Sequence, residues 1–561
     1  MASPNNFLIG IDVGTASTRA GLFDPAGRLL AAAASGHEVF RPRPDFVEQS
    51  SDGIWEKAGE CVREVLRASG VAPEAVAGLG FDATCSLVCL DAADRPLSVS
   101  GDGDARRNII VWMDHRAVAQ AERINRGGHR VLDYVGGRMS PEMQPPKLLW
   151  LKENLPGTWA KAGRFLDLAD FLVYRATGQD RRSLCTSVCK WTYLGHQGPE
   201  GAWDLEFFRA IGLADLFGHG RVPATAHPLG SLAGALSAKS AAELGLTTGT
   251  MVGVGIIDAH AGGLGSLGPV AASARTDPAA WDRALALVGG TSSCHMVSSY
   301  TPRFVPGVWG PYRAAMIPGM WLNEGGQSAS GALLDQLVAD SAAGAKLAEE
   351  ATKKGESVYQ ALNRIVHELQ AAAGCGPELT IGLHVLPYHH GNRSPRADPG
   401  ARGTVSGLTL ESGAETLALR YYATVQAIAY GTRHIIEALG EQGYRTADIH
   451  LCGGHVNNPL LVQEYADVTG CQVALPREKE AVLLGAAILG ATAAGVHPDL
   501  LAAMQAMSHA GEVVRPDSRH AAYHGRKYEA FTRMYGQQKE LAAIMAGGGE
   551  AESRSSCAVH P

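Results

Sequence analysis

The start of the chain alternates apolar and small polar residues in a pattern typical of a β-hairpin. The stretches FLIGIDVG and TRAGLFDPAG predict two strands joined by a turn of small residues, and RLLAAAASG predicts a third strand. SSDGIWEKAGECVREVLRASG then has helical spacing, with Ser51 or Asp52 as the expected cap and Gly70 as the expected end. Further strand signals follow in VAGLGFDATCSLVCLD, so we expect an α/β fold.

The same order of elements recurs in the middle of the chain. ALALVGGTSSCHMVSS, which begins at Ala284, again predicts a strand, a Gly-Thr-Ser turn and a strand. GPVAASARTDPAAWDRA has the composition of a linker between two related halves. We therefore expect one domain over residues 1–268 and a second over 284–525, with a ligand cleft between them. The last residues, 547–561, are predicted to be disordered.

Length and charge narrow the range of partners. With 561 residues the chain is long enough for two domains, and its net charge of -7 argues against nucleic acid as the main partner.

AVLLGAAILGATAAGV is shorter than the ~20 residues needed to span a bilayer, so we expect a closely packed internal helix. The N-terminus lacks a basic region followed by a long apolar one. We expect a cytoplasmic protein without a membrane partner.

Two pairs of cysteines have a CxxxC spacing, Cys85 with Cys89 and Cys185 with Cys189. Zinc sites usually have tighter spacing and flanking turn residues. We therefore interpret these residues as reduced, buried thiols of a cytoplasmic protein.

The first turn carries candidate chemistry. Asp12 lies inside an apolar strand, where a carboxylate is destabilising unless it has a partner or binds a metal. The following residues, 14–18, expose backbone N–H groups with little side-chain bulk, which is typical of an anion-binding turn. Asp12 could hold Mg²⁺ through water beside such an anion. The alternative is an ordinary hairpin in which the aspartate is hydrogen-bonded within the protein. However, residues 289–293 form a second turn of glycine and hydroxyl residues in the other half.

Two further stretches extend this interpretation. In MVGVGIIDAHAGGLGSLG an apolar strand leads to Asp258, which could be a general base for a hydroxyl nucleophile or the cap of a helix. In LCGGHVNNPLLVQEYADVTG, Gly453 and Gly454 precede a helix and would allow the flat group of a nucleotide to approach the backbone.

Eight ordered motifs resemble the FGGY family of carbohydrate kinases, in the actin/hexokinase superfamily. They are GIDVGTASTRAGLFD, VWMDHRA, KLLWLKEN, GIIDAHAG, GGTSSCH, NEGGQSASG, PYHHGNRSPRADPGARGTVSGL and CGGHVNNPLLVQEYADVTG. They extend from residue 9 to about residue 470, and FDATCSLV and VWMDHRA are most similar to the D-ribulokinase branch. The segment MSPEMQPP and His455 depart from the family pattern. The resemblance implies two ribonuclease H-like α/β domains on either side of an active-site cleft.

The resemblance also implies roles for particular residues. Asp258 would take the proton from the terminal hydroxyl of a pentulose, which the similarity to the D-ribulokinase branch indicates is D-ribulose, and Asp12 would position Mg²⁺ beside ATP. The residues expected to bind ATP are Gly14, Thr15, Ser17 and Arg19 at the first turn, Gly290, Thr291 and Ser292 at the second, and Gly453, Gly454 and Asn457 or Asn458 at the adenine pocket. The residues expected to bind the sugar are Thr84, Cys85, Asp114, Lys190, Glu324 and Gln327.

Several alternatives stay open at this stage. Lys190 could be a surface lysine whose stem packs among apolar neighbours. The substrate could be ribitol, L-ribulose, D-xylulose or glycerol. The fold could also serve a nucleotide-binding sensor or a chaperone-like ATPase, or a scaffold without catalysis. A homodimer is left open as well.

Overall fold

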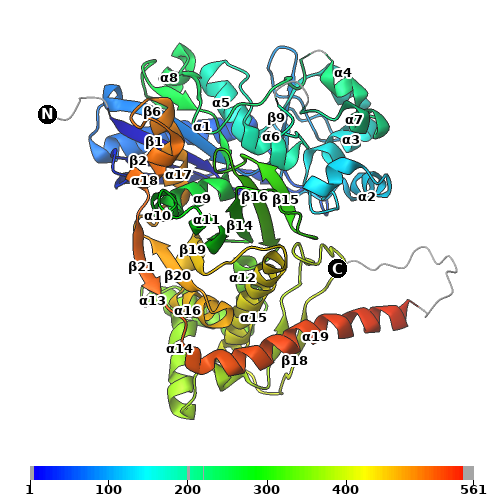
Figure 1. Ribbon diagram of the computed structural model, residues 1–561, viewed down its shortest axis with the longest axis vertical. Helices are drawn as coiled ribbons and strands as arrows, with labels where there is room; N and C mark the ends of the chain where they lie inside the picture. Colours follow the sequence, from blue (N-terminus) through cyan, green and yellow to red (C-terminus); the bar gives the residue numbers. More distant parts are fainter. Residues whose placement is uncertain (1–5, 199–201, 219, 547–561) are drawn as a thin grey trace.

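Two mixed β-sheets form the framework of the described chain, residues 6–198, 202–218 and 220–546 of the computed structural model (Figure 1). The first sheet has the spatial order β10 (Leu232–Ala235), β11 (Met251–Gly253), β6 (Val76–Ala83), β1 (Phe7–Val13), β2 (Ser17–Phe23) and β3 (Leu29–Gly36), with β12 (Ile256–Ile257) also paired to β6. The second has the order β15 (Trp309–Arg313), β16 (Trp321–Gln327), β14 (Ser293–Ser299), β13 (Ala284–Gly289), β19 (Asp448–Cys452), β20 (Gln472–Pro476) and β21 (Ala510–Val514).

The two sheets share one strand arrangement. β1 is antiparallel to β2 and parallel to β6, and β13 is likewise antiparallel to β14 and parallel to β19. In both sheets the antiparallel pair is joined by the short turn of small residues that the sequence predicts. The repeated pattern of apolar strand, small turn and apolar strand therefore reflects a repeated structural unit.

A smaller sheet and several helices extend the first half. The sheet has the order β4 (Val39–Phe40), β5 (Glu48–Gln49), β8 (Ile109–Ile110), β7 (Leu87–Asp91) and β9 (Ala162–Asp167). The helices are α2 (Val118–Arg126), α3 (Gln144–Asn154), α4 (Pro156–Lys161), α5 (Leu168–Thr177), α6 (Leu184–Lys190), α7 (Leu205–Ala210) and α8 (Ala238–Leu244). Figure 1 shows α2, α3, α4 and α7 together at one end of the first half.

The first long helix, α1 (Ser51–Ser69), begins earlier than we expect, and the predicted cap is wrong. Ser50, rather than Ser51 or Asp52, is the N-cap, and its side chain accepts a hydrogen bond from the backbone N–H of Gly53. Gly70 ends the helix with a φ of 70°, which a glycine adopts without strain. The apolar face of α1, which includes Ile54, is buried.

A helix from late in the chain packs on the first sheet. α17 (Ala481–Ala493) is buried along most of its length and lies against β1, β6 and α9 (Asp258–Ser266). A side chain at Gly10 or Gly80 would overlap the backbone of this helix. The internal helix predicted from AVLLGAAILGATAAGV is therefore confirmed. The predicted second domain, 284–525, includes this helix although it packs on the sheet of the first half.

The remaining helices surround the second sheet and connect the halves. They are α12 (Gly331–Ala339), α13 (Ala342–Lys353), α14 (Val358–Ala373), α15 (Ala414–Glu441), α16 (Pro459–Thr469), α18 (Leu500–Met507) and α19 (Ala521–Met545), beside a small sheet of β17 (His384–Leu386) and β18 (Thr404–Ser406). The stretch that has a linker-like composition contains two short helices, α10 (Gly268–Ser273) and α11 (Ala280–Arg283), and α10 packs against α18.

The tail predicted to be disordered, residues 547–561, lies outside the described residues. Within the described ranges, each cysteine is a free thiol. None of the helices in those ranges is long and apolar enough to cross a membrane.

Candidate active site

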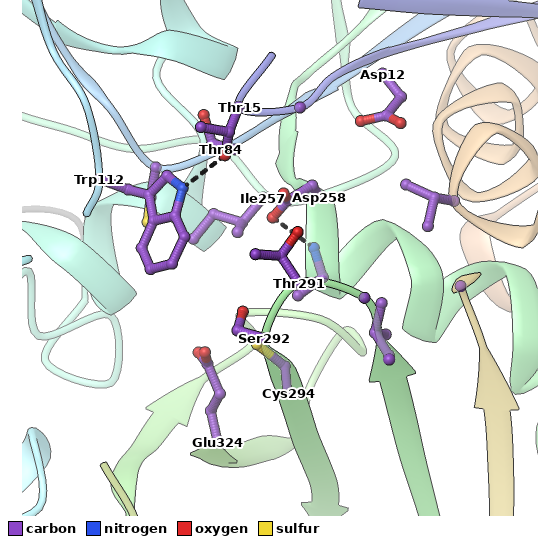
Figure 2. Close-up of a pocket in the computed structure, with 18 of the residues that line it drawn as sticks. Asp12, Thr15, Thr84, Trp112, Ile257, Asp258, Thr291, Ser292, Cys294 and Glu324 are labelled. Carbon is purple, nitrogen blue, oxygen red and sulfur yellow. Dashed lines mark hydrogen bonds between the residues drawn. The ribbon is translucent and has the colours of Figure 1, made fainter. Parts of the chain in front are cut away.

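A cavity of about 420 Å³ lies between the two halves, and both contribute to its lining. Most of the residues that the sequence indicates meet here. They are Asp12, Gly14, Thr15, Ser17, Arg19, Thr84, Cys85, Lys190 and Asp258 from the first half and Gly290, Thr291, Ser292, Glu324, Gly453 and Gly454 from the second. In the view of Figure 2, Asp258 lies between Asp12 and Glu324.

Two predicted sugar-binding residues do not line this cavity. The buried carboxylate of Asp114 accepts a hydrogen bond of 2.6 Å from the backbone N–H of Val47 and forms an ion pair of 2.7 Å with Arg116. The side chain of Gln327 donates to the carbonyl of Ile428 and to the hydroxyl of Thr432, at 3.0 and 3.1 Å. Both groups already have protein partners, so we leave them out of the proposed site.

The two candidate asparagines also lie elsewhere. Asn458 is the N-cap of α16, and its side chain donates to the hydroxyl of Tyr421 at 2.7 Å. Asn457 lines a separate depression beside Pro459 and Asn363. The glycines just before them, at the end of β19, are the part of this motif that lines the cavity.

Asp12, which lines the cavity, belongs to a cluster of charged residues. Asp12 on β1 is paired in register with Asp82 on β6, and Arg19 on β2 donates to the Asp12 carboxylate at 2.8 Å. Arg19 also forms an ion pair of 2.8 Å with Glu480, just before α17. The arginine explains why a strand carries a buried aspartate, since the charge has a partner.

Asp82 has no comparable partner. Among the described residues, neither of its buried carboxylate oxygens accepts a hydrogen bond. Burial and the neighbouring Asp12 raise the pKa of Asp82 well above its usual value. A buried, unpartnered carboxylate next to a second one is the kind of oxygen-donor group that Mg²⁺ prefers.

Asp258 is both the first residue of α9 and a cavity residue. Its Oδ1 accepts a hydrogen bond of 2.7 Å from the backbone N–H of Ala259 (Figure 2). Burial, with the negative charge of Asp12 as the next largest cause, raises the pKa of Asp258 to about 6. The prediction of Asp258 as a helix cap is wrong, because Ile257 is the N-cap and Asp258 is the first residue of α9. The raised pKa makes the carboxylate a stronger base.

The two small-residue turns face the cavity. In the first, Gly14 N–H donates to the carbonyl of Ser17 at 3.0 Å, and in the second Gly290 N–H donates to that of Ser292 at 2.9 Å. The start of α12 supports the second turn, because Gly331 N–H donates to the carbonyl of Gly290 at 3.0 Å. A methyl group at Gly14 or Gly290 would have no protein atom closer than 3.6 Å.

The opposite end of the cavity carries a buried lysine and a carboxylate. Lys190 is 3% exposed, and its Nζ lies 4.3 Å from the ring centroid of Trp309. Burial alone lowers the pKa of Lys190, but Cys85 and Glu324 outweigh it, and the pKa is raised. The alternative of a surface lysine is therefore wrong.

Several cavity residues were missed by the sequence analysis. Trp112 donates from Nε1 to the hydroxyl of Thr15 at 3.0 Å (Figure 2). Arg393 forms an ion pair of 3.3 Å with Glu142. Burial raises the pKa of Glu142, but Arg393 and His115 outweigh it and lower the pKa to about 2. These side chains lie in motifs that the sequence analysis quotes, but their orientation depends on contacts between distant segments.

Sequence profiles of one protein family match both halves of the chain. The N-terminal domain of the FGGY family of carbohydrate kinases matches residues 7–265, and its C-terminal domain matches residues 285–494. The chain belongs to this family. It is a carbohydrate kinase, and membership implies ATP as the phosphoryl donor and a sugar as the acceptor.

Individual proteins agree with this assignment. The chain is 49% identical over 545 residues to an FGGY carbohydrate kinase domain-containing protein of Danio rerio, covering 96% of this chain and 99% of that protein. It is 39% identical over 512 residues to a D-ribulokinase of Saccharomyces cerevisiae, covering 87% and 72%. The solved structure of a xylulose kinase from Rhodospirillum rubrum is similar at a TM-score of 0.74 and 23% identity, covering 96% and 99%. The expected two-domain α/β kinase fold is therefore confirmed.

Proposed function

We propose that this FGGY kinase transfers the γ-phosphoryl group of ATP to the terminal hydroxyl of D-ribulose. The observation that carries the proposal is the placement of Asp258 between the acidic, glycine-lined end of the cavity and the end with Lys190 and Glu324. The 39% identity to a yeast D-ribulokinase supports this sugar over the other pentuloses and polyols.

Asp258 acts as the general base. It accepts the proton of the sugar hydroxyl, the hydroxyl oxygen forms a bond to the γ-phosphorus, and the bond from that phosphorus to the bridging oxygen breaks to release ADP. Gly14 N–H and Gly290 N–H close their own turns, and other N–H groups of these turns bind phosphate oxygens. The backbone at Gly453 and Gly454 lies along the adenosine. Lys190 and Glu324 bind hydroxyl groups of the sugar.

The acidic end fits a magnesium ion. Asp82 offers two buried oxygens without hydrogen-bond partners among the described residues, and Asp12 lies beside it, so these two residues would hold the ion. When bound, Mg²⁺ neutralises charge on the phosphates during transfer.

The proposal is tested by ADP release with Mg·ATP against D-ribulose, L-ribulose, ribitol, D-xylulose and glycerol. We expect the highest kcat/KM with D-ribulose. Turnover independent of any sugar would instead support a sensor or chaperone-like ATPase, and preference for another acceptor would reassign the substrate.

The Asp258→Asn variant tests the assigned base. We expect kcat to fall by about 10²–10⁴-fold, the usual contribution of a general base. A nucleotide-binding measurement on the same variant is the control, because the amide keeps the shape of the side chain. Near-normal turnover in Asp258→Asn would show that another group accepts the proton.

A further inference from the structure

Two cysteines and a histidine lie together beside Glu324, at the end of the cavity that carries Lys190 and Glu324. One ligand atom each of Cys185, Cys189 and His260 falls within 4.8 Å of the other two. All three side chains are fully buried, at 0% exposure. Two thiols and an imidazole at this spacing are a common set of zinc ligands.

The helices explain why these residues meet. Cys185 and Cys189 are four residues apart on α6, so their side chains lie on the same face of the helix. His260 lies in the first turn of α9, two residues after Asp258. The cluster is thus held by the same two helices that carry Lys190 and the proposed base.

Glu324 provides a fourth donor. Its Oε2 lies 3.7 Å from His260 Nε2, which in turn is 3.8 Å from Cys189 Sγ. In a tetrahedral zinc site, metal–ligand bonds of 2.0–2.3 Å place the ligand atoms about 3.3–3.8 Å apart. The two observed separations lie at the upper end of this range, and Glu324 is outside the group of three ligand atoms, so its carboxylate completes the site after a small movement of the side chain.

Glu324 also has unused bonding capacity. Within the described residues, Glu324 Oε2 is buried and has no hydrogen-bond partner. A buried carboxylate oxygen without a partner is destabilising, and coordination of a cation would relieve this. Glu324 lines the cavity, so a cation can enter from that side.

We propose that Cys185, Cys189, His260 and Glu324 form a binding site for Zn²⁺. Thiolate and imidazole ligands favour zinc over magnesium, so this site is chemically distinct from the oxygen donors Asp12 and Asp82. In this proposal Cys185 and Cys189 are zinc ligands, which replaces our interpretation of these two residues as ordinary buried thiols. Zinc at this site occupies Glu324 and therefore inhibits binding of the sugar, a consequence that rests on the proposed function.

The site is tested with Co²⁺ as a spectroscopic substitute for Zn²⁺ on the reduced full-length protein, without sugar or nucleotide. We expect one equivalent of Co²⁺ to give thiolate-to-metal charge-transfer absorption and tetrahedral visible bands, both removed by one equivalent of Zn²⁺. Cys185→Ala/Cys189→Ala should abolish these bands. The matched control Cys61→Ala/Cys471→Ala removes two buried thiols elsewhere and should keep them.

A single-atom change keeps the test valid if the double variant fails to fold. Glu324→Gln retains the shape of the side chain and should weaken Co²⁺ binding by at least about tenfold. Absence of charge-transfer bands in the wild type, or their equal loss in both double variants, would overturn the proposal.

A second arm separates the metal site from the proposed function. D-ribulose should raise the apparent dissociation constant for Co²⁺, since both ligands use Glu324. Spectroscopic binding of Co²⁺ without any effect of D-ribulose would keep the metal site and count against Glu324 as a sugar ligand.

Discussion

The turn between β1 and β2 and the turn between β13 and β14 occupy matching places in their sheets, yet their flanking residues differ. On β1, Asp12 is opposite Arg19, whereas the corresponding ladder position on β13 pairs Val288 with Cys294. Both turns line the cavity. The comparison indicates that the two turns share one backbone arrangement, whereas a charged pair flanks the turn of the first half alone.

The supports of the two turns also differ. Four residues separate the paired residues Val13 and Thr18, but only three separate Gly289 and Ser293. The second turn is further braced by His455, whose Nε2 lies 3.2 Å from the carbonyl oxygen of Gly290. We therefore regard the departure of His455 from the family pattern as a structural support for the second turn.

Removing the charge of Asp12 should show the largest difference between the two halves. In Asp12→Asn we expect the Mg²⁺ concentration for half-maximal turnover to rise by about 10–100-fold, because a group that holds a metal through water is lost. The measurement is a Mg²⁺ titration of ADP release at saturating sugar.

The matched variant Val288→Asn places the same side chain at the corresponding position of the second half. It should leave the Mg²⁺ requirement unchanged. Equal shifts in both variants would show that the metal site is not confined to the first half.

Adding one methyl group to each turn tests their shared function. Gly14→Ala and Gly290→Ala meet no protein atom closer than 3.6 Å, so both should fold normally. Each should raise KM for ATP by about tenfold, because the methyl group keeps the phosphate from approaching the turn closely and so weakens a hydrogen bond to a charged group. Steady-state kinetics and thermal unfolding distinguish ligand effects from folding effects.

Gly289→Ala provides the contrast to this pair. Its methyl group would overlap the imidazole of His455, so we expect a loss of about 1–3 kcal/mol in the free energy of unfolding. A normal melting temperature for Gly289→Ala, or a lowered one for Gly14→Ala, would contradict the difference in support that we describe.

The repeated unit of strand, turn and strand could be predicted from the sequence because the patterns that specify it are local. Apolar runs such as FLIGIDV and ALALVG, each followed by glycine and hydroxyl residues, specify strand and turn without help from distant segments. Asp258 was found for the same reason, since a carboxylate at the end of an apolar strand is visible in one short stretch. The residues at the two turns that we expected to bind ATP all line the cavity, whereas Ala16, Thr18 and Ser293 do not.

The sequence could not show which side chains of an irregular segment face the cavity. In VWMDHRA we selected Asp114, but Arg116 and the backbone at Val47 hold that carboxylate, and Trp112 faces Thr15 instead. Glu142 and Arg393 are 251 residues apart and meet only in the folded protein. Such orientations follow from long-range pairing, which no local pattern encodes.

The smallest expected effect concerns the pH dependence of the base. The pKa of Asp258 is raised to about 6, and a base must be deprotonated to act. In the wild type, kcat/KM for the sugar should therefore be constant above this pH and fall about tenfold per pH unit below it. Part of the shift comes from the negative charge of Asp12, so Asp12→Asn should move the acidic limb to lower pH. Asp24→Asn changes a half-buried turn carboxylate that does not line the cavity and should leave the limb in place. If the limb stays near pH 6 in Asp12→Asn, burial alone sets the pKa of the base, and the carboxylates of the first half act separately.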